Sequence, residues 1–288
     1  MDYSTMWKIA EENDKERLSR QTEPDGVKKI IDIPYMDDGN KYHLFDVYYP
    51  EKTNSPLPVI IDIHGGGWVY GTKEINKIYC MLLAKQGYTV FNINYRLIPD
   101  CDFSGQMNDV SRALGFIYAH LGDYPCDKGR VYLTGDSAGG QLAAYACAVN
   151  ESEKLREIFS FEKSDFKANA MGLISPNLYL TPFDFKNVYF RRLLGKDYKN
   201  LPYVDYLTGE ALLNESTMPP AFLATSKGDF MAVRQTVGTY EAFKAHDIPV
   251  ELLNWDDEKL PHAFSVLEPE KEESKETTRK MLEFFDRY

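Results

Sequence analysis

The chain has 288 residues, of which 43 % are hydrophobic and 27 % are charged, as in ordinary folded proteins, which excludes an intrinsically disordered or collagen-like chain. A formal net charge of −11 argues against nucleic acid or an anionic membrane surface as a partner, because either would select a basic face. The first twenty residues lack a basic start followed by an apolar stretch, and no apolar run approaches the roughly 20 residues of a membrane span. We therefore expect a cytoplasmic chain without a membrane partner.

The N-terminal part predicts a helix over residues 4–20, which a Pro24-Asp25-Gly26 break ends. Two alternating stretches, 27–35 and 43–49, flank an Asp-Asp-Gly-Asn turn signal and predict a β-hairpin. The run Val59-Ile60-Ile61-Asp62-Ile63 is nearly all apolar, which is typical of a strand buried on both faces.

From residue 59 onward, strand and helix patterns alternate. Predicted strands cover 59–63, 88–94, 131–134, 171–174, 221–224 and 250–254, and predicted helices cover 73–86, 105–121, 138–150, 232–246 and 269–287. This order predicts one α/β domain with a mostly parallel sheet flanked by helices. The charged stretch 152–167 is expected at the surface, and 176–218 fits no strand–helix unit and is expected to be an insertion.

The cysteine and histidine content limits which disulfides, metal sites and cofactors are expected. The four cysteines show no CxxC spacing, which predicts reduced thiols. Only five histidines exist, namely His43, His64, His120, His246 and His262. A multi-histidine metal site is therefore not expected, and neither is a cofactor.

The motif Gly135-Asp136-Ser137-Ala138-Gly139 lies between a predicted strand and a predicted helix. In that context a GxSxG sequence indicates a nucleophile elbow, a strained turn that lifts the serine hydroxyl above the sheet edge. Small neighbours let strand and helix pass closely, and the helix N-terminus favours negative charge at the hydroxyl. Ser137 is therefore the candidate nucleophile.

A second motif, His64-Gly65-Gly66-Gly67-Trp68, follows the strand that ends at Ile63. Three consecutive glycines carry no side chains that would block their backbone N–H groups. These N–H groups can therefore approach a reacting carbonyl oxygen and stabilise an oxyanion. His64 is an alternative base, but its position beside this loop suits a structural hydrogen bond better.

A serine nucleophile needs a base and an orienting carboxylate. His262 lies between the last predicted strand and helix, at the sheet edge where open α/β sheets place their sites. Asp229 follows the strand 221–224 at the same edge and is the candidate acid. Asp256 and Asp257 also follow a strand and stay as competitors.

The order Ser137, Asp229, His262, with HGGGW before GDSAGG, resembles the hormone-sensitive-lipase-like carboxylesterases of the α/β-hydrolase fold. The resemblance covers about residues 42–288. It implies a Ser137–His262–Asp229 triad and an oxyanion hole formed by the N–H groups of Gly66, Gly67 and Ala138. It also implies structural roles for Tyr95 and Arg96. The acid loop, Ser-Lys-Gly-Asp-Phe-Met, departs from the family by lacking a proline after the aspartate.

The family also carries a cap over the site, which here would come from residues 1–25 and 176–218. The insertion is rich in rings, which suit either the roof of an apolar cleft or attachment to the core. These are Tyr179, Phe183, Phe185, Tyr189, Phe190, Tyr198, Tyr203 and Tyr206.

We expect a serine carboxylesterase that hydrolyses short-chain esters of small molecules through an acyl-enzyme. Acetyl-ester hydrolysis on carbohydrate or xylan, and amide or formamide hydrolysis, are the enzymatic alternatives. A binding protein on an inactive hydrolase fold is disfavoured, since every reacting residue is present. The sequence leaves open whether the chain forms a homo-oligomer.

Overall fold

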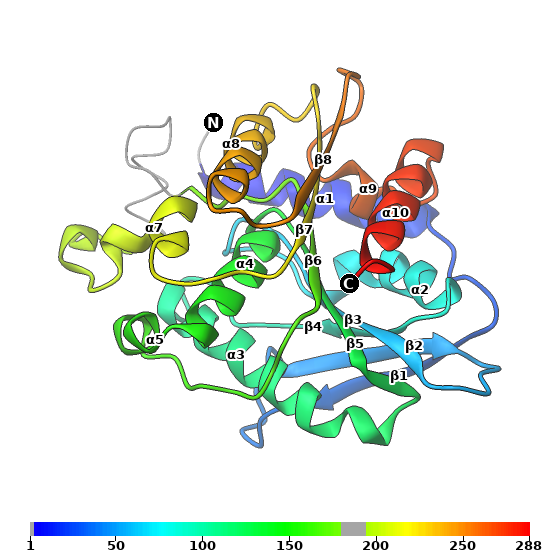
Figure 1. Cartoon of the computed structure of the whole chain (residues 1–288). Helices are drawn as coiled ribbons and strands as arrows, with labels where there is room; N and C mark the ends of the chain where they lie inside the picture. Colours follow the sequence, from blue (N-terminus) through cyan, green and yellow to red (C-terminus); the bar gives the residue numbers. More distant parts are fainter. Residues whose placement is uncertain (1–2, 180–193) are drawn as a thin grey trace.

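The structure is a computed structural model that describes residues 3–179 and 194–288 (Figure 1). Its centre is one eight-stranded sheet with the order β1-β2-β4-β3-β5-β6-β7-β8. The strands are β1 (Val27–Pro34), β2 (Leu44–Pro50), β3 (Leu57–Ile63), β4 (Thr89–Ile93), β5 (Cys126–Asp136), β6 (Ala170–Ile174), β7 (Ala221–Ser226) and β8 (Val250–Trp255). β2 pairs antiparallel with β1 and β4, and all other neighbours are parallel. The predicted mostly parallel sheet is confirmed.

Helices cover both faces of the sheet. One face carries α3 (Phe103–His120), α4 (Ala138–Glu151) and α8 (Val233–Ala245), with α5 (Glu153–Phe159) and α7 (Gly209–Leu213) packed beside them. The other face carries α2 (Lys77–Lys85) and α10 (Glu272–Phe285). The 3₁₀ turns are η1 (Lys73–Asn76), η2 (Leu121–Asp123), η3 (Tyr198–Asn200) and η4 (Val204–Tyr206), and the remaining helices are α1 (Tyr3–Arg20) and α9 (Phe264–Leu267). None of the helices in the described ranges has the length and hydropathy of a membrane-spanning segment.

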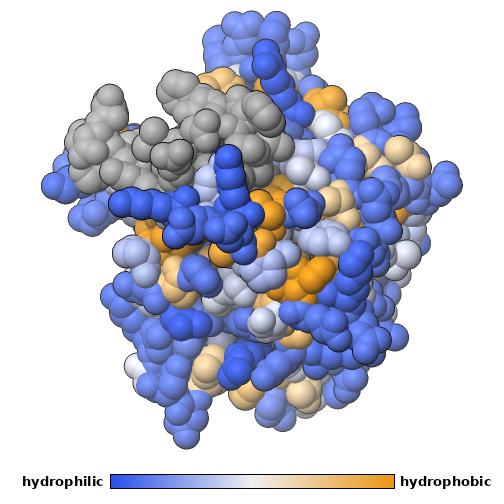
Figure 2. All heavy atoms as spheres, turned by 90° about the vertical axis from the view of Figure 1, so that its left-hand side faces the viewer, coloured by the Kyte–Doolittle hydropathy of each residue, from blue (hydrophilic) through white to orange (hydrophobic). Residues whose placement is uncertain are grey.

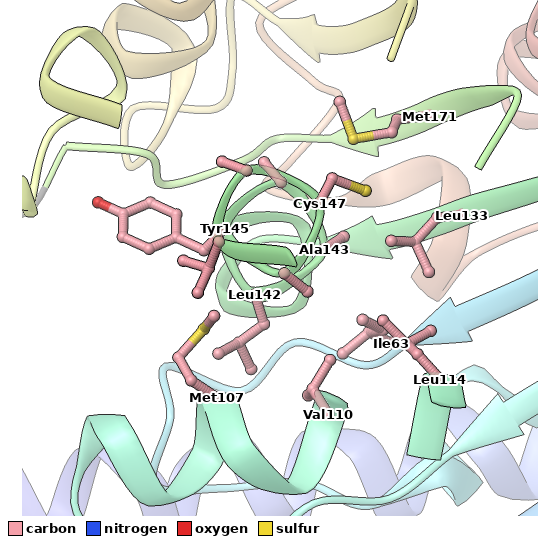
Figure 3. Close-up of a cluster of buried hydrophobic side chains, with 14 of the residues drawn as sticks. Ile63, Met107, Val110, Leu114, Leu133, Leu142, Ala143, Tyr145, Cys147 and Met171 are labelled. Atoms are coloured by element: carbon pink, nitrogen blue, oxygen red, sulfur yellow. The ribbon is translucent and has the colours of Figure 1, made fainter. Parts of the chain in front are cut away.

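The larger part of the core lies between the sheet and the α3–α4 layer. Figure 3 shows α4 end-on, with Leu142 and Ala143 between Val110 of α3 and Leu133 of β5. Every α4 residue from Ala138 to Asn150 is buried, which explains why its sequence is rich in alanine and glycine. A helix this enclosed fixes the position of the residue directly before it, Ser137.

The structure differs from the predicted elements in three places. The stretch 152–167 contains α5, whose Leu155 and Phe159 are fully buried, so the prediction of a wholly surface segment was wrong. The predicted helix 73–86 begins as the 3₁₀ turn η1. The predicted helix 269–287 is shorter and is preceded by α9, because the chain between them contains Pro269, which has no N–H to continue a helix.

The sheet register brings the predicted motifs to one edge. Ile63 of β3 pairs with Gly135 of β5, so the glycine loop and the serine turn leave adjacent strands at the same level. Asp136 pairs with Ile174 of β6, and Ser226 pairs with Trp255 of β8. The loops after β3, β5, β6, β7 and β8 therefore leave the same carboxyl edge of the sheet, where parallel α/β proteins place their sites.

Candidate active site

The serine turn has the strained geometry of a nucleophile elbow. Ser137 has φ 51° and ψ −115°, a backbone conformation that side chains other than glycine rarely adopt. Its N–H donates to the carbonyl of Ile174 at 2.9 Å. A Cβ at Gly139 would lie 2.0 Å from the Ile63 carbonyl oxygen, and one at Gly135 would lie 2.6 Å from the carbonyl carbon of Gly139. Glycine is therefore required at both flanks for strand and helix to pass this closely.

The glycine loop after β3 is held by the aspartate that precedes the serine. The N–H of Gly65 donates to Asp136 Oδ1 at 3.0 Å, so this donor has a structural role. Gly66 has φ 113°, and a Cβ there would lie 2.0 Å from the carbonyl oxygen of Tyr70. Ala138 is the first residue of α4, where a backbone N–H has no partner within the helix. This geometry puts backbone of the loop and of the helix N-terminus together at one edge.

The structure joins Asp229 and His262 directly. His262 Nδ1 lies 2.8 Å from Asp229 Oδ1, which also accepts the Ala232 N–H at 2.9 Å. Asp229 is fully buried, which opposes its charge, but the hydrogen bond and charge of His262 outweigh burial and lower its pKa. An ionised Asp229 accepts a hydrogen bond from Nδ1–H, which keeps that proton on Nδ1 and leaves Nε2 as the acceptor nitrogen.

Hydrogen bonds between loops place His262 beside the serine turn. Ser137 is bonded through its N–H to Ile174, and the next residue, Ser175, accepts the N–H of Ala263 at 3.2 Å. His262 Nε2 is buried and has no hydrogen-bond partner among the described residues, so Ser137 Oγ is not bonded to it in this state. Catalytic hydrogen bonds often tighten only when substrate binds, and Nε2 is open to accept a proton.

The competing acids lie away from the imidazole. Asp256 is 91 % exposed at its side chain and faces Lys227, and Asp257 accepts the N–H of Lys259. A Cβ at Gly228 would lie 2.5 Å from the carbonyl oxygens of both Glu258 and Leu260. Gly228 thus lets the Asp229 loop lie against the chain that leads to His262.

His64, the alternative base, has a structural environment. Burial lowers its pKa to about 4, and its Nδ1 lies 2.7 Å from the Gly65 carbonyl oxygen. The ring stacks on Tyr95 at 4.4 Å, and the Tyr95 hydroxyl donates to the His64 carbonyl at 2.9 Å. The Arg96 guanidinium donates two hydrogen bonds to Asp109, at 2.8 and 2.7 Å, and the Arg96 N–H donates a third at 3.0 Å. Tyr95 thus supports the loop that His64 begins, and Arg96 ties the segment after β4 to α3.

A family model named BD-FAE matches residues 45–218, which is more than half of the chain and contains the elbow and the glycine loop. This chain belongs to the BD-FAE family. BD-FAE proteins are related to the hormone-sensitive-lipase-like carboxylesterases, and the homologues of this chain are carboxylic ester hydrolases.

A solved structure that is similar to this BD-FAE protein assigns its fold. The crystal structure of esterase B from Lactobacillus rhamnosis (HN001) superposes with a TM-score of 0.90 at 30 % identity, covering 99 % of this chain and 93 % of that one. This match assigns the α/β-hydrolase fold.

Curated relatives are similar over shorter stretches. The probable isoprenylcysteine alpha-carbonyl methylesterase ICMEL1 of Arabidopsis thaliana is 33 % identical over 37 % of this chain and 22 % of its own length. The probable carboxylic ester hydrolase LipM of Mycobacterium tuberculosis is 32 % identical over 48 % of this chain and 32 % of its own. The chain thus spans about a fifth to a third of the length of these two relatives.

A buried polar network of this BD-FAE chain was missed from the sequence. Asn76 Nδ2 donates to Asp136 Oδ1 at 2.9 Å and to Asp62 Oδ2 at 2.8 Å, while Thr134 donates to the other oxygen of Asp62. The signal available was Asp62 itself, a carboxylate inside an otherwise apolar strand. Burial is the main cause that raises the pKa of Asp136 to about 6, and the charge of Asp62 adds to it.

The raised pKa of Asp136 predicts a pH-dependent stability. The Asp136 carboxyl holds a proton in the folded protein that the unfolded chain releases. The stability that this proton contributes is complete below about pH 4 and is lost as pH rises through about 6. At pH 7 the loss amounts to at most about 3 kcal/mol. Asp136→Asn keeps an oxygen acceptor for Gly65 and should flatten this part of the pH profile of the unfolding free energy.

Urea unfolding between pH 4 and pH 8 measures this effect. The exposed Asp286→Asn is the matched control and should keep the wild-type profile. An Asp136→Asn profile that runs parallel to wild type would contradict the assignment.

Some aromatic residues of the insertion lie in the part of the chain that the structure describes, and others do not. Tyr203 stacks on Phe159 at 5.1 Å and lies 6.0 Å from Phe103, and Tyr198 is also buried in the core cluster. These two rings attach the insertion to the core. Four of the predicted rings lie outside the described residues, namely Phe183, Phe185, Tyr189 and Phe190. A cap formed by residues 1–25 and 176–218 therefore stays a prediction.

Proposed function

We propose that this protein is a serine carboxylesterase with Ser137 as nucleophile, His262 as base and Asp229 as its orienting acid. The observation that carries the proposal is the 2.8 Å contact between His262 and the buried Asp229, next to a serine held at φ 51°. The ester hydrolases among its homologues and structural neighbours support ester hydrolysis as the reaction.

In the proposed reaction, Ser137 Oγ attacks the ester carbonyl carbon while its proton passes to His262 Nε2. The N–H groups of Gly66, Gly67 and Ala138 would bind the resulting oxyanion, each donor contributing about 3 to 4 kcal/mol to lowering the barrier. The imidazolium, stabilised by Asp229, then protonates the leaving alcohol oxygen. Water repeats the two steps on the acyl-enzyme and releases the acid. Among the described residues no group of His, Cys, Asp or Glu is arranged to hold a metal ion, and none of these steps uses one.

We further propose a preference for short acyl chains of small-molecule esters. Esterase B of Lactobacillus rhamnosis has been crystallised inhibited by a C4-C4 tributyrin phosphonate, and its structure superposes on this chain with a TM-score of 0.91. The face of this chain in Figure 2 is mostly hydrophilic, with apolar residues in small separate areas, and the net charge is −11. Such a surface does not favour adsorption to an anionic lipid interface.

The nitrophenyl ester series from acetate to palmitate tests this preference. We expect kcat/KM to peak at about two to six acyl carbons and then to fall, because each further methylene adds about 0.8 kcal/mol only where a pocket can bury it. A maximum at ten carbons or more, or activation by an oil–water interface, would identify a lipase instead. Acetylated xylan and a formanilide, assayed beside the esters, distinguish the carbohydrate-ester and amide alternatives.

A further inference from the structure

The N-terminal helix α1 contacts the glycine loop through one tyrosine. The Tyr70 hydroxyl donates to Asp14 Oδ2 at 2.9 Å, and the Trp7 ring stacks on the Tyr70 ring at 5.5 Å. Both contacts join residues more than fifty positions apart in the sequence. They tie α1 to the loop that follows β3.

The same helix reaches the histidine side of the site through Arg17. Arg17 donates to Asp14 Oδ1 from Nε and Nη2, at 3.1 and 2.9 Å. Its Nη1 donates to the carbonyl of Leu267 at 2.9 Å, and Gln21 Nε2 donates to the same carbonyl at 2.7 Å. Leu267 ends α9, five residues after His262. Arg17 Nη2 also lies 3.3 Å from the carbonyl oxygen of Ile75, which is in η1.

The Asp14–Arg17 ion pair is largely buried, so its two side chains are held in one geometry. The side chains are 18 % and 11 % exposed. Another ion pair of α1, Glu11–Lys15, is 52 % and 71 % exposed. An exposed pair of this kind contributes little to structure. The enclosed Arg17 guanidinium fixes several groups at once, because it donates twice to one Asp14 oxygen and also to the carbonyls of Leu267 and Ile75.

Two contacts of α1 lead to the backbone of the glycine loop. The Tyr70 N–H donates to the Gly66 carbonyl at 3.0 Å, and the Tyr70 carbonyl oxygen occupies the space where Gly66 would carry a Cβ. Moving Tyr70 would therefore move Gly66, whose N–H is a proposed oxyanion donor. The residue after Ile75, Asn76, holds Asp136 and through it the N–H of Gly65.

We propose that Asp14, Arg17 and Tyr70 are positioning residues that hold the oxyanion loop and the His262 segment at a fixed separation. This inference rests on the proposed function, because it assigns α1 a role in the same reaction. Oxyanion stabilisation depends on donors fixed before the reaction, so a small displacement of the loop lowers the rate of the chemical step more than it lowers substrate binding. Helix α1 thus links the glycine loop, through Asp14 and Tyr70, to the segment that follows His262, through Arg17. We call this set of contacts the strap.

Tyr70→Phe is the decisive variant, because it removes one hydroxyl and keeps the ring, the stack on Trp7 and the backbone. With p-nitrophenyl butyrate we expect kcat to fall about tenfold while KM stays within about twofold. The rate of inactivation by a p-nitrophenyl alkylphosphonate should fall by the same factor as kcat, because its charged adduct requires the same donors. Asp14→Asn should show the same split between kcat and KM.

Glu11→Gln is the matched control, since it removes an exposed ion pair of the same helix and should leave both constants at the wild-type value. A purely structural role for the strap would lower the melting temperature of Tyr70→Phe and leave kcat unchanged below it, and that result would overturn the inference. A kcat equal to that of Glu11→Gln would also overturn it. All variants are compared with active wild type, whose own turnover and sensitivity to Ser137→Ala test the proposed function separately.

Discussion

Ser137→Ala is expected to lower kcat/KM for p-nitrophenyl butyrate by about 10⁵- to 10⁶-fold, as loss of a triad nucleophile does. The hydroxyl is the only group removed, and the turn itself is held by the Ile174 carbonyl and by the glycines that flank it. The circular dichroism spectrum and the melting temperature should therefore stay close to wild type. Progress curves with purified protein, followed for hours, measure the residual rate.

Ser55→Ala is the control, because Ser55 is exposed in the loop between β2 and β3, and it should keep wild-type activity. If folded Ser137→Ala turned over ester within tenfold of wild type, another nucleophile would be at work and the proposed mechanism would be rejected.

Asp229→Asn is expected to lower kcat by about 10⁴-fold, somewhat less than loss of the serine. An amide at this position can donate to Nδ1, which would leave the proton on Nε2 and make the imidazole unable to accept the proton of Ser137. Asp229 Oδ1 makes both the Nδ1 contact and the Ala232 contact, so an amide that faces Nδ1 loses the Ala232 hydrogen bond, and the unfolding free energy is measured alongside kcat. His262→Ala should behave like Ser137→Ala.

Asp256→Asn and Asp257→Asn are the matched controls for the acid. Both residues follow β8 close to His262 in the sequence, but Asp256 faces Lys227 and Asp257 accepts the N–H of Lys259. We expect kcat within about threefold of wild type for both, since neither contacts the imidazole. The reverse order, with Asp229→Asn near wild type and either control inactive, would show that the acid is misassigned.

Local sequence patterns were sufficient for most of the fold. Val59 to Ile63 reads as a buried strand because both faces of β3 are covered, and the small residues after Ser137 read as a helix that packs closely. α5 was missed because its charged residues outnumber the two apolar side chains that it buries. Its N-cap, Ser152, accepts the Leu155 N–H and was the local signal for a helix start.

The supporting groups of the site could not be read from local patterns. Asp136 was part of the serine motif, but its partners Gly65 and Asn76 come from two other segments. The strap depends on Asp14 meeting Tyr70, and a helix pattern over 4–20 says nothing about which loop the helix will face. Such contacts are set by tertiary packing, which the motif spacing does not encode.

Mass spectrometry after reaction with a p-nitrophenyl alkylphosphonate tests the central claim most directly. We expect one phosphonyl adduct per chain, located on the peptide that contains Ser137, with esterase activity lost in proportion to labelling. Ser137→Ala should take up no label under the same conditions. A stoichiometric adduct on any other residue, or full labelling of Ser137 with esterase activity retained, would contradict the assignment of Ser137 as the nucleophile.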